Sequence, residues 1–380
     1  MKFSMIFEAQ TADSSPAAEQ QVLRDCVEQA VLGEEMGFDR VWAVEHHALE
    51  WYAHMSAPEI FLTWVAARTS RIRIGHGVVC MPFNYNHPVR AAERAAMLDV
   101  LSGGRVDVGA GRGATLQEMA LCGVDPERTY AEVDEALRLF GSAWQNETFE
   151  WHGELLDIKP PEGKYHKILP RPVQTPHPPL FLACTKRDTV KLAAEYGVGA
   201  LVMGFAGPDE IRLYRKIYDE AIAARTPDTM VSTVANDSLV ALCPTIVSDD
   251  AESARRYGVR GQRFFAESIA YWYGGGEPPA LEFGDDPLGD LEERKQAHIS
   301  RLHEAQIPVN PETAAPFNVN HAYGDAQRAI DYVQQLVDAG ADEIMCLIQM
   351  GLVPHEVCME TIRQWGETVI PHFRDQQKKA

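Results

Sequence analysis

Short apolar, β-branched stretches alternate with helical patterns along almost the whole chain, and this alternation constrains the fold more than any other feature of the sequence. Strands that alternate with helices predict βα units, whose strands lie parallel to one another. Eight such units can be counted, which predicts an α/β fold, a (β/α)8 TIM barrel, formed by a single domain over residues 1–380. The expected strands cover residues 2–9, 39–44, 71–81, 105–110, 180–183, 199–203, 239–247 and 343–348.

Two stretches interrupt the alternation. Residues 148–157 alternate around a glycine in the manner of a small β-hairpin, and a proline-rich connection follows up to residue 179. Residues 274–320 are acidic, rich in Pro and Gly and without clear periodicity. Long stretches of this kind are typical of lids or disordered segments, so we expect a lid or a flexible insertion within the barrel domain.

Charge and cysteine content exclude several classes of protein. A formal net charge of −20, without a Lys/Arg cluster, argues against binding to nucleic acid or to an anionic membrane surface. Seven scattered cysteines without a Cys-x-x-Cys pair favour neither a disulfide framework nor a zinc site. Because no signal peptide and no membrane-spanning apolar run is recognisable, we expect a cytoplasmic protein.

The expected second strand ends in ionisable residues, Glu45, His46 and His47. In an α/β barrel, catalytic residues come from the carboxyl ends of the strands. Histidine also changes its protonation near neutral pH, so it can move a proton. Adjacent histidines occur equally in surface loops and structural hydrogen bonds, but their position at the end of this strand favours a catalytic role.

Two later strand ends offer groups suited to a phosphate. Residues 109–113 follow the fourth strand, where glycines permit close backbone approach and Arg112 can bind a phosphate through two N–H groups. Their spacing fits neither the dinucleotide fingerprint nor a phosphate loop, so a plain βα turn is the alternative. Residues 185–189 begin a helix, whose free N–H groups favour an anion; here the alternative is an N-cap beside solvated charges. Both lie at carboxyl strand ends, which favours one shared phosphate ligand.

Several motifs together resemble the bacterial luciferase-like flavin-dependent monooxygenases. These motifs are residues 41–47, 87–90, 98–99, 102–105, 111–113, 123–125, 350–356 and 369–373, and they span nearly the whole chain in the family's order. The resemblance implies a (β/α)8 barrel and a homodimer. It also implies that the protein uses FMN, reduced by a separate NAD(P)H flavin reductase, together with molecular oxygen.

The resemblance assigns roles to single residues. His46 matches the active-site histidine beside the flavin, where Glu45 and His47 either orient it or bond to neighbouring loops. The implied cofactor-binding residues are Gly77, Val78, Gly111, Arg112, Arg128, Thr185, Lys186 and Thr189. The peptide between Gly77 and Val78 matches a non-proline cis peptide under the flavin ring.

Two of these positions depart from the luciferase pattern. Thr185 stands where bacterial luciferase has a glutamate, and Gly111 stands where it has a cysteine close to the flavin. The missing cysteine speaks against assuming light emission.

Three functions are therefore considered. The first is a two-component FMN monooxygenase acting on a hydrophobic or aromatic small molecule, since aromatic residues lie near the expected barrel mouth. The second is a deazaflavin-dependent oxidoreductase of the same superfamily, which transfers hydride without oxygen. The third is a non-catalytic flavin-binding protein. The Glu45, His46 and His47 pattern favours the first.

Overall fold

The computed structural model describes residues 1–205, 207–282, 286, 288–304 and 315–377, and within them eight parallel strands close into a barrel. Their order around the barrel is β1, β2, β3, β4, β7, β8, β9 and β11, and β11 pairs with β1 to close it. The predicted (β/α)8 fold is confirmed. The strands are β1 (Lys2–Phe7), β2 (Arg40–Ala43), β3 (Arg73–Cys80), β4 (Val106–Gly111), β7 (Leu180–Cys184), β8 (Gly199–Val202), β9 (Leu239–Val247) and β11 (Glu343–Leu347).

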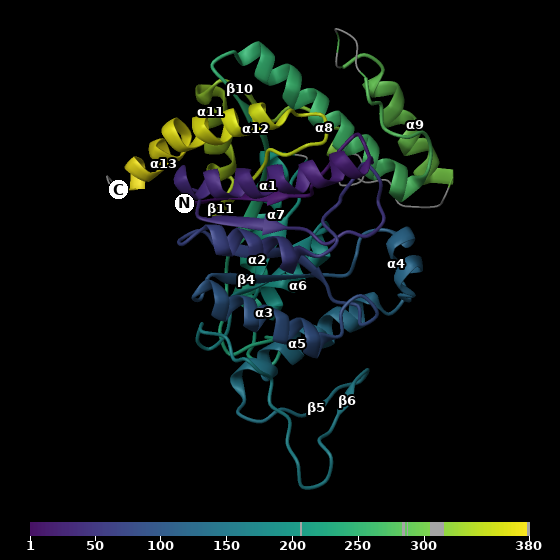
Figure 1. Cartoon of the computed structure of the whole chain (residues 1–380), viewed down its shortest axis with the longest axis vertical. Coiled ribbons are helices and arrows are strands. Elements are labelled where there is room, and N and C mark those ends of the chain that lie inside the picture. The colour runs from purple at the N-terminus through teal and green to yellow at the C-terminus, as the bar shows by residue number, and fades with distance from the viewer. Residues whose placement is uncertain (206, 283–285, 287, 305–314, 378–380) are drawn as a thin grey trace.

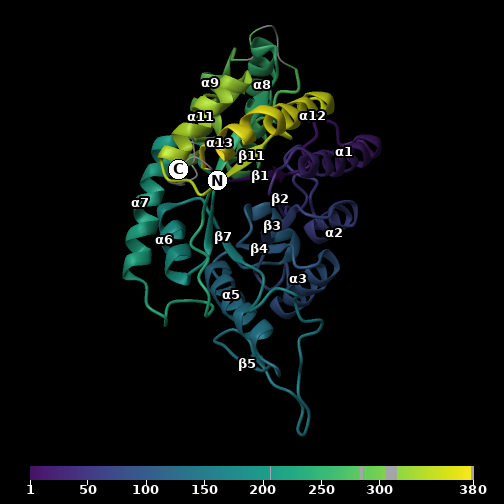
Figure 2. The ribbon, with the colours of Figure 1, turned by 90° about the vertical axis from the view of Figure 1, so that its left-hand side faces the viewer.

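Helices surround this barrel (Figures 1 and 2). Proline occupies the first position of α1, α2, α3 and α7, where its missing N–H group is tolerated. The outer helices are α1 (Pro16–Glu35), α2 (Pro58–Arg68), α3 (Pro88–Ser102), α5 (Thr129–Gln145), α6 (Arg187–Tyr196), α7 (Pro208–Ala224), α8 (Ala251–Gly274), α11 (Ala326–Asp338) and α12 (His355–Gln364). The last helix continues through a π-helical turn, η2 (Trp365–Val369), into α13 (Ile370–Gln377). None of the described helices is long and apolar enough to cross a membrane.

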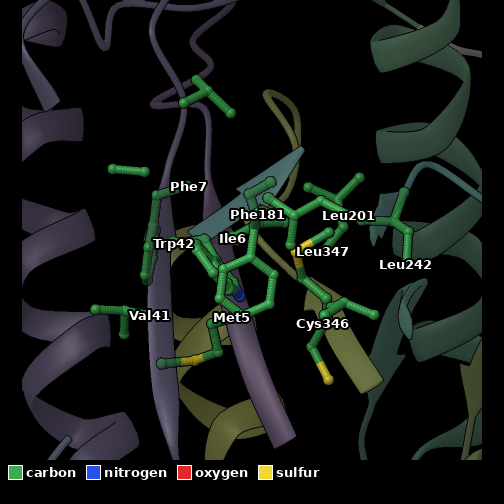
Figure 3. Close-up of a cluster of buried hydrophobic side chains, with 14 of the residues drawn as sticks. Met5, Ile6, Phe7, Val41, Trp42, Phe181, Leu201, Leu242, Cys346 and Leu347 are labelled. Carbon is green, nitrogen blue, oxygen red and sulfur yellow. The ribbon is translucent and has the colours of Figure 1, made fainter. Parts of the chain in front are cut away.

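Apolar side chains fill the barrel interior (Figure 3). Trp42 and Phe181 meet edge to face there, with ring centroids 5.0 Å apart, and both are almost completely buried. Burying rings of this size contributes strongly to stability, because each removes a large apolar area from water.

A buried ionic cluster lies at the amino-terminal end of the barrel. The Arg40 guanidinium donates to Asp107 Oδ2 at 2.7 Å and also pairs with Glu343. Trp42 Nε1 donates to Glu343 Oε1 at 3.1 Å, and Arg73 Nε donates to Asp107 Oδ2 at 2.7 Å. The three central ionic groups, Arg40, Asp107 and Glu343, are each at most 3% exposed, so their charges depend on one another.

The two insertions behave differently. The expected hairpin is present as β5 (Trp151–His152) and β6 (Asp157–Ile158), and it projects away from the barrel (Figure 1). The region without periodicity contains a helix, α9 (Leu291–Glu304), which the sequence pattern does not predict. Residues 283–285, 287 and 305–314 of the expected lid lie outside the described residues.

The sequence pattern also missed α4 (Leu116–Cys122) and β10 (Ala322–Gly324), and it extended β1 too far, because the strand ends at Phe7. Figure 1 shows that α4 and α9 lie on the side toward which the strands point, whereas both marked termini lie on the opposite side. The carboxyl ends of the strands, where active sites of such barrels lie, therefore face α4 and α9.

Candidate active site at the barrel mouth

His46 lies in the loop after β2, at the carboxyl end of the barrel, and its side chain is 13% exposed. Its Nδ1 is 2.9 Å from Glu118 Oε1. The ring also meets Tyr52 edge to face at 5.0 Å. These contacts fix the orientation of the imidazole, which is a requirement for directional proton transfer.

Glu118 comes from the short helix α4, and the start of that helix holds it in place. Thr115 and Glu118 form a capping box, in which Thr115 Oγ1 accepts from the Glu118 N–H and the Thr115 N–H donates to Glu118 Oε2. The other oxygen, Oε1, accepts from the His47 N–H at 3.0 Å and faces His46. The buried Glu118 carboxylate therefore both caps the start of α4 and holds the loop that carries His46 and His47.

Glu8 approaches His46 from the other side, in the loop after β1. Its Oε2 lies 3.9 Å from His46 Nε2, and this buried oxygen has no hydrogen-bond partner within the described part of the chain. The pKa of Glu8 is raised to about 7, because the effect of burial outweighs the charge of His46, which lowers the pKa, and the charge of Glu118 adds to the effect of burial. Near neutral pH this carboxyl is therefore poised between its two protonation states.

His46 is consequently placed between two acids of different character. Burial alone lowers the pKa of His46, but the hydrogen bond and charge of Glu118, with the charges of Glu8 and Glu45, outweigh it and raise the pKa above its ordinary value. Burial raises the pKa of Glu118, yet the hydrogen bond and charge of His46 lower it overall. An ionised Glu118 keeps a proton on Nδ1, so Nε2 is the nitrogen that can exchange a proton at the mouth.

Glu8→Gln tests this environment through stability. The folded pKa of Glu8 is raised from 4.5 to about 7, so its protonation stabilises the fold fully below pH 4.5, and this stabilisation is lost as the pH rises through about 7. Glutamine stays neutral throughout. We therefore expect the difference in free energy of unfolding, variant minus wild type, to increase by up to about 3 kcal/mol between pH 4.5 and 8. Urea unfolding at several pH values measures it, and a constant difference would refute the raised pKa.

Glu45 and His47 do not hold His46 directly. Glu45 Oε2 accepts from the Cys80 N–H at 2.8 Å, and Glu45 Oε1 accepts from Asn86 Nδ2 at 2.9 Å and lies 3.1 Å from His47 Nε2. The His47 ring stacks on Tyr85 with centroids 5.5 Å apart. Of the two roles left open by the sequence, the structure shows hydrogen bonds to neighbouring loops, and Glu118 orients His46 instead.

The loops that carry these groups contain unusual backbone conformations. Ala9 and Ala48 have φ values of 54°, and Trp51 has 64°, although residues with a side chain rarely adopt this left-handed region. Strained residues of this kind tend to gather at functional sites, since the surrounding structure must hold them. Their position next to Glu8 and His46 supports this mouth as the functional end.

Arg112 follows β4 at the same mouth. Its guanidinium lies 5.2 Å from the ring of Tyr130, near the start of α5. Arg128, two residues before Tyr130, has a side chain that is 51% exposed and is 3.3 Å from Glu132 Oε1. The structure therefore brings Arg112 close to the segment of Arg128, but Arg128 itself is engaged in a surface ion pair.

The predicted turn after β7 lies beside the end of β4, since Ala110 pairs with Leu182. Thr185 and Lys186 are exposed there, at the start of α6. Thr189 Oγ1 accepts from the Lys186 N–H at 3.2 Å and donates to the Lys186 carbonyl at 2.8 Å. The Thr189 hydroxyl is thus used in capping the helix.

The peptide between Gly77 and Val78 is cis, as the resemblance predicted. Both residues are partly exposed although most of β3 is buried, so this part of the strand is accessible to solvent. A side-chain carbon added at Gly111 would lie 2.3 Å from Val78 Cγ2. Gly111 therefore makes room for Val78, which is a physical reason for glycine where luciferase has cysteine.

Aromatic rings continue from His46 along one wall. Tyr52 meets Phe265 of α8 at 5.4 Å, and Phe265 meets Phe205 at 5.2 Å. The carboxyl-terminal end of α8 also contacts the mouth loop, since Tyr271 meets Trp51 at 5.5 Å. Tyr52, Phe265 and Phe205 are each at most 4% exposed, and this buried aromatic wall contrasts with the charged surroundings of His46.

Two acidic residues of this site, Glu8 and Glu118, were not predicted. Thr115 and Glu118 carry the spacing of a capping box, so the sequence did contain a signal for α4. Glu8 was included in the first strand, and recognising the earlier end of that strand would have placed it beside Glu45 at the mouth. The pairing of either acid with His46 depends on contacts between distant segments, which the sequence pattern does not encode.

Comparison with known protein families gives one match over most of the chain. The model described as luciferase-like monooxygenase matches residues 1–343. The oxygenase component of a flavin-dependent trigonelline monooxygenase from Acinetobacter baylyi is 24% identical over 358 residues, which are 93% of this chain and 90% of that protein.

Solved structures show the same fold at low sequence identity. Monooxygenase RslO1 from Streptomyces bottropensis has a TM-score of 0.75 and 23% identity, covering 98% of this chain and 100% of that one. A coenzyme F420 dependent tetrahydromethanopterin reductase from Methanopyrus kandleri has a TM-score of 0.65 and 19% identity, covering 98% and 99%. Proteins similar to this chain thus include both flavin-dependent monooxygenases and enzymes that use a deazaflavin.

Proposed function

The chain belongs to the luciferase-like monooxygenase family, and on this basis we propose that it is the oxygenase component of a two-component FMN-dependent monooxygenase. Reduced FMN comes from a separate NAD(P)H flavin reductase, and molecular oxygen is the second substrate. The aromatic wall of Tyr52, Phe265 and Phe205 supports a hydrophobic or aromatic small molecule as the compound that is oxygenated.

One observation carries this proposal. A histidine held between two buried acids lies at the same barrel mouth as an arginine and a helix start suited to a phosphate. His46 provides the group for proton transfer. Arg112 and residues 185–189 provide the groups that bind the phosphate. A cofactor with a phosphate tail and a reactive ring requires both kinds of group at once.

The residues present fit a flavin mononucleotide. Gly77 and Val78 are partly exposed and offer a flat backbone surface for a ring, and Val78 is seated against Gly111. Arg112 and the N–H groups at the start of α6 offer charge and donors for a phosphate. When bound, the reduced flavin supplies the electrons with which oxygen is activated.

The protein's own groups then have separate tasks. His46 Nε2 takes up or delivers a proton beside the ring, Glu118 fixes the tautomer, and Glu8 exchanges a proton with His46 near neutral pH. The aromatic wall keeps water from the reacting centre. The carboxyl-terminal end of α8 is held to the loop after β2 by the hydrogen bond from Trp272 Nε1 to the Glu50 carbonyl at 2.9 Å.

A deazaflavin-dependent hydride transfer is the second candidate. It is supported by the similarity of the fold to the F420-dependent reductase. His46 would then act on the substrate hydroxyl or its equivalent, and oxygen would not be consumed. Gly111 lacks the thiol that luciferase has at the matching position, but this difference does not favour either candidate function.

We also propose a homodimer. The outer faces of α2 and α3 carry exposed apolar side chains, including Ile60 at 69%, Trp64 at 50%, Met97 at 53% and Leu101 at 67% exposure. Neighbouring exposed apolar side chains of this size mark an interaction surface more often than a free one. Sedimentation velocity of the full chain tests this, and a monomer at micromolar concentration would contradict it.

Arg112→Ala tests the binding of the phosphate. Loss of a charge-assisted hydrogen bond to the phosphate is expected to cost about 1.5–3 kcal/mol, or about one to two decades in affinity for reduced FMN. Arg128→Ala is the matched comparison, and a smaller effect is expected because Arg128 pairs with Glu132. Anaerobic titration with reduced FMN measures both. An unchanged affinity in Arg112→Ala would remove this residue from the site.

The function itself is tested by oxygen uptake. The full chain is combined with a generic flavin reductase, NADH and FMN, and supplied with aldehydes, ketones and polycyclic aromatic compounds in turn. The proposal expects at least one compound to be converted to an oxygenated product with matching oxygen uptake. If no apolar compound were oxygenated while a reduced deazaflavin supported turnover without oxygen, the second candidate would replace the first.

A further inference from the structure

A second cluster of ionisable side chains lies away from the barrel mouth site, where the first and last long helices meet. Asp25 and Glu28 belong to α1, and His355 is the first residue of α12. His355 Nδ1 is 3.7 Å from Asp25 Oδ1, and His355 Nε2 is 3.5 Å from Glu28 Oε2. The three residues each offer one ligand atom, and these atoms all lie within 4.8 Å of one another.

Neither of these two separations is a hydrogen bond, since both exceed the usual 2.7–3.2 Å for nitrogen and oxygen. One histidine nitrogen binds one ion, so only the 3.5 Å between His355 Nε2 and Glu28 Oε2 compares directly with the spacing of ligands around a metal ion. Two ligands at about 2.0–2.1 Å from a tetrahedral ion lie roughly 3.4 Å apart. The cluster therefore needs only small side-chain movements to close around an ion.

A buried glutamine provides an independent observation. Gln29, which is 1% exposed, places Nε2 3.2 Å from His355 Nδ1, whereas its buried Oε1 has no hydrogen-bond partner among the described residues. The two ends of a carboxamide have nearly the same shape, so reversing it puts Oε1 on His355 Nδ1. Gln29 Oε1 then accepts the Nδ1 proton of His355, and the lone pair of His355 Nε2 is free to bind a metal ion. This is the arrangement in which a supporting residue fixes a metal-binding histidine.

We propose that Asp25, Glu28 and His355 bind a divalent transition-metal ion, with Zn²⁺ as the reference ion, and that Gln29 positions the histidine. Two carboxylates balance the charge of the ion, and an imidazole nitrogen favours zinc over magnesium or calcium, which prefer oxygen ligands. The side chains of Asp25, His355 and Glu28 are 18%, 28% and 57% exposed, so an ion can enter from solvent.

A metal ion at this site links two parts of the chain that are distant in sequence, α1 and α12. Asp25 and Glu28 are separated from His355 by more than three hundred residues, as the separation of 326 residues between Gln29 and His355 shows. An ion held by both helices binds the folded chain and not the unfolded one, so it raises the stability of the barrel closure. The site is independent of the proposed function, because none of its residues lies at the barrel mouth site.

The test uses the tag-free full chain after removal of metals with a chelator. Isothermal titration with ZnCl₂ is expected to show a site of micromolar or tighter affinity, and zinc is expected to raise the unfolding temperature. His355→Ala is expected to weaken this site at least tenfold and to abolish the shift in unfolding temperature. Gln29→Leu keeps the buried volume and is expected to weaken the site by about tenfold, as for other residues that support a ligand.

His372→Ala is the matched control, because it removes an exposed histidine on α13 that hydrogen-bonds only Gln376 among the described residues. This variant is expected to bind zinc as the wild type does. The proposal fails if the wild type shows no zinc-dependent rise in unfolding temperature, or if His355→Ala binds zinc with unchanged affinity. In that case His355 acts only as an ionic link between α1 and α12.

Discussion

His46→Ala is expected to lower coupled turnover by a factor of about 10²–10⁴ while leaving the affinity for reduced FMN within a fewfold of the wild type. The physical reason is the separation of tasks at the mouth. His46 is held by Glu118 and faces Glu8, whereas the proposed phosphate contacts come from the ends of β4 and β7. Product formed per reduced FMN consumed is the measurement, and release of hydrogen peroxide is expected to rise as product falls.

His54→Ala is the matched control, since this histidine lies near the same mouth, is 15% exposed, and bonds through Nδ1 to the Ala9 carbonyl and not to Glu118. Its coupled turnover is expected to stay close to that of the wild type. Glu118→Gln adds a second measurement, the pH profile of turnover, which would not change if the role of His46 were only structural. Because Glu118 raises the pKa of His46, the limb of the pH profile due to His46 is expected to shift to lower pH. Full coupled turnover in His46→Ala would make this histidine structural.

Arg40→Met is expected to lower the free energy of unfolding by about 3–5 kcal/mol, as is typical when one partner of a buried ionic pair is removed. Arg40 joins Asp107 and Glu343 at the base of the barrel, where all three are nearly inaccessible to water. Asp107 keeps Arg73 in the variant, but Glu343 keeps only the Trp42 N–H among the described partners. Urea unfolding at neutral pH measures the loss.

Two further variants test this prediction. Arg212→Met removes an exposed arginine paired with Asp209, whose side chain is 96% exposed, and such surface pairs are worth about 0–1 kcal/mol. Adding Glu343→Gln to Arg40→Met removes the stranded charge, so part of the lost stability is expected to return. A loss below about 1 kcal/mol in Arg40→Met would show that the cluster is not a stabilising element.

The barrel could be predicted because its information is local. The boundaries of α7 at Pro208 and of α3 at Pro88 follow from proline at the first helical position, and β9 follows from a run of residues in which only Thr245 is polar. Helix α9 was missed because its buried positions are only Leu291, His298 and Leu302, which form too sparse an apolar stripe to stand out. Helix α4 is only seven residues long.

The site could be predicted only where a residue type at a strand end was informative by itself. The positions of His46 and Arg112 at the carboxyl ends of β2 and β4 were predicted in this way. The partners of His46 could not be found, because Glu118 is 72 residues away and Glu8 lies in the loop after a different strand, β1. Their meeting with His46 depends on the closed barrel. Glu45 and His47 have the right residue types, but their side-chain hydrogen bonds are to Cys80, Asn86 and each other. The cis peptide between Gly77 and Val78 came from family resemblance alone.

We propose that the barrel mouth binds reduced FMN and that the bound flavin reacts with oxygen. The most direct test of this proposal is an anaerobic titration of the full chain with reduced FMN and, separately, with reduced coenzyme F420, followed by rapid mixing with oxygen. We expect reduced FMN to bind more tightly than reduced F420, Arg112→Ala to lose this preference, and the bound flavin to consume oxygen. Tighter binding of the deazaflavin, together with oxygen consumption no faster than that of free reduced FMN, would contradict it.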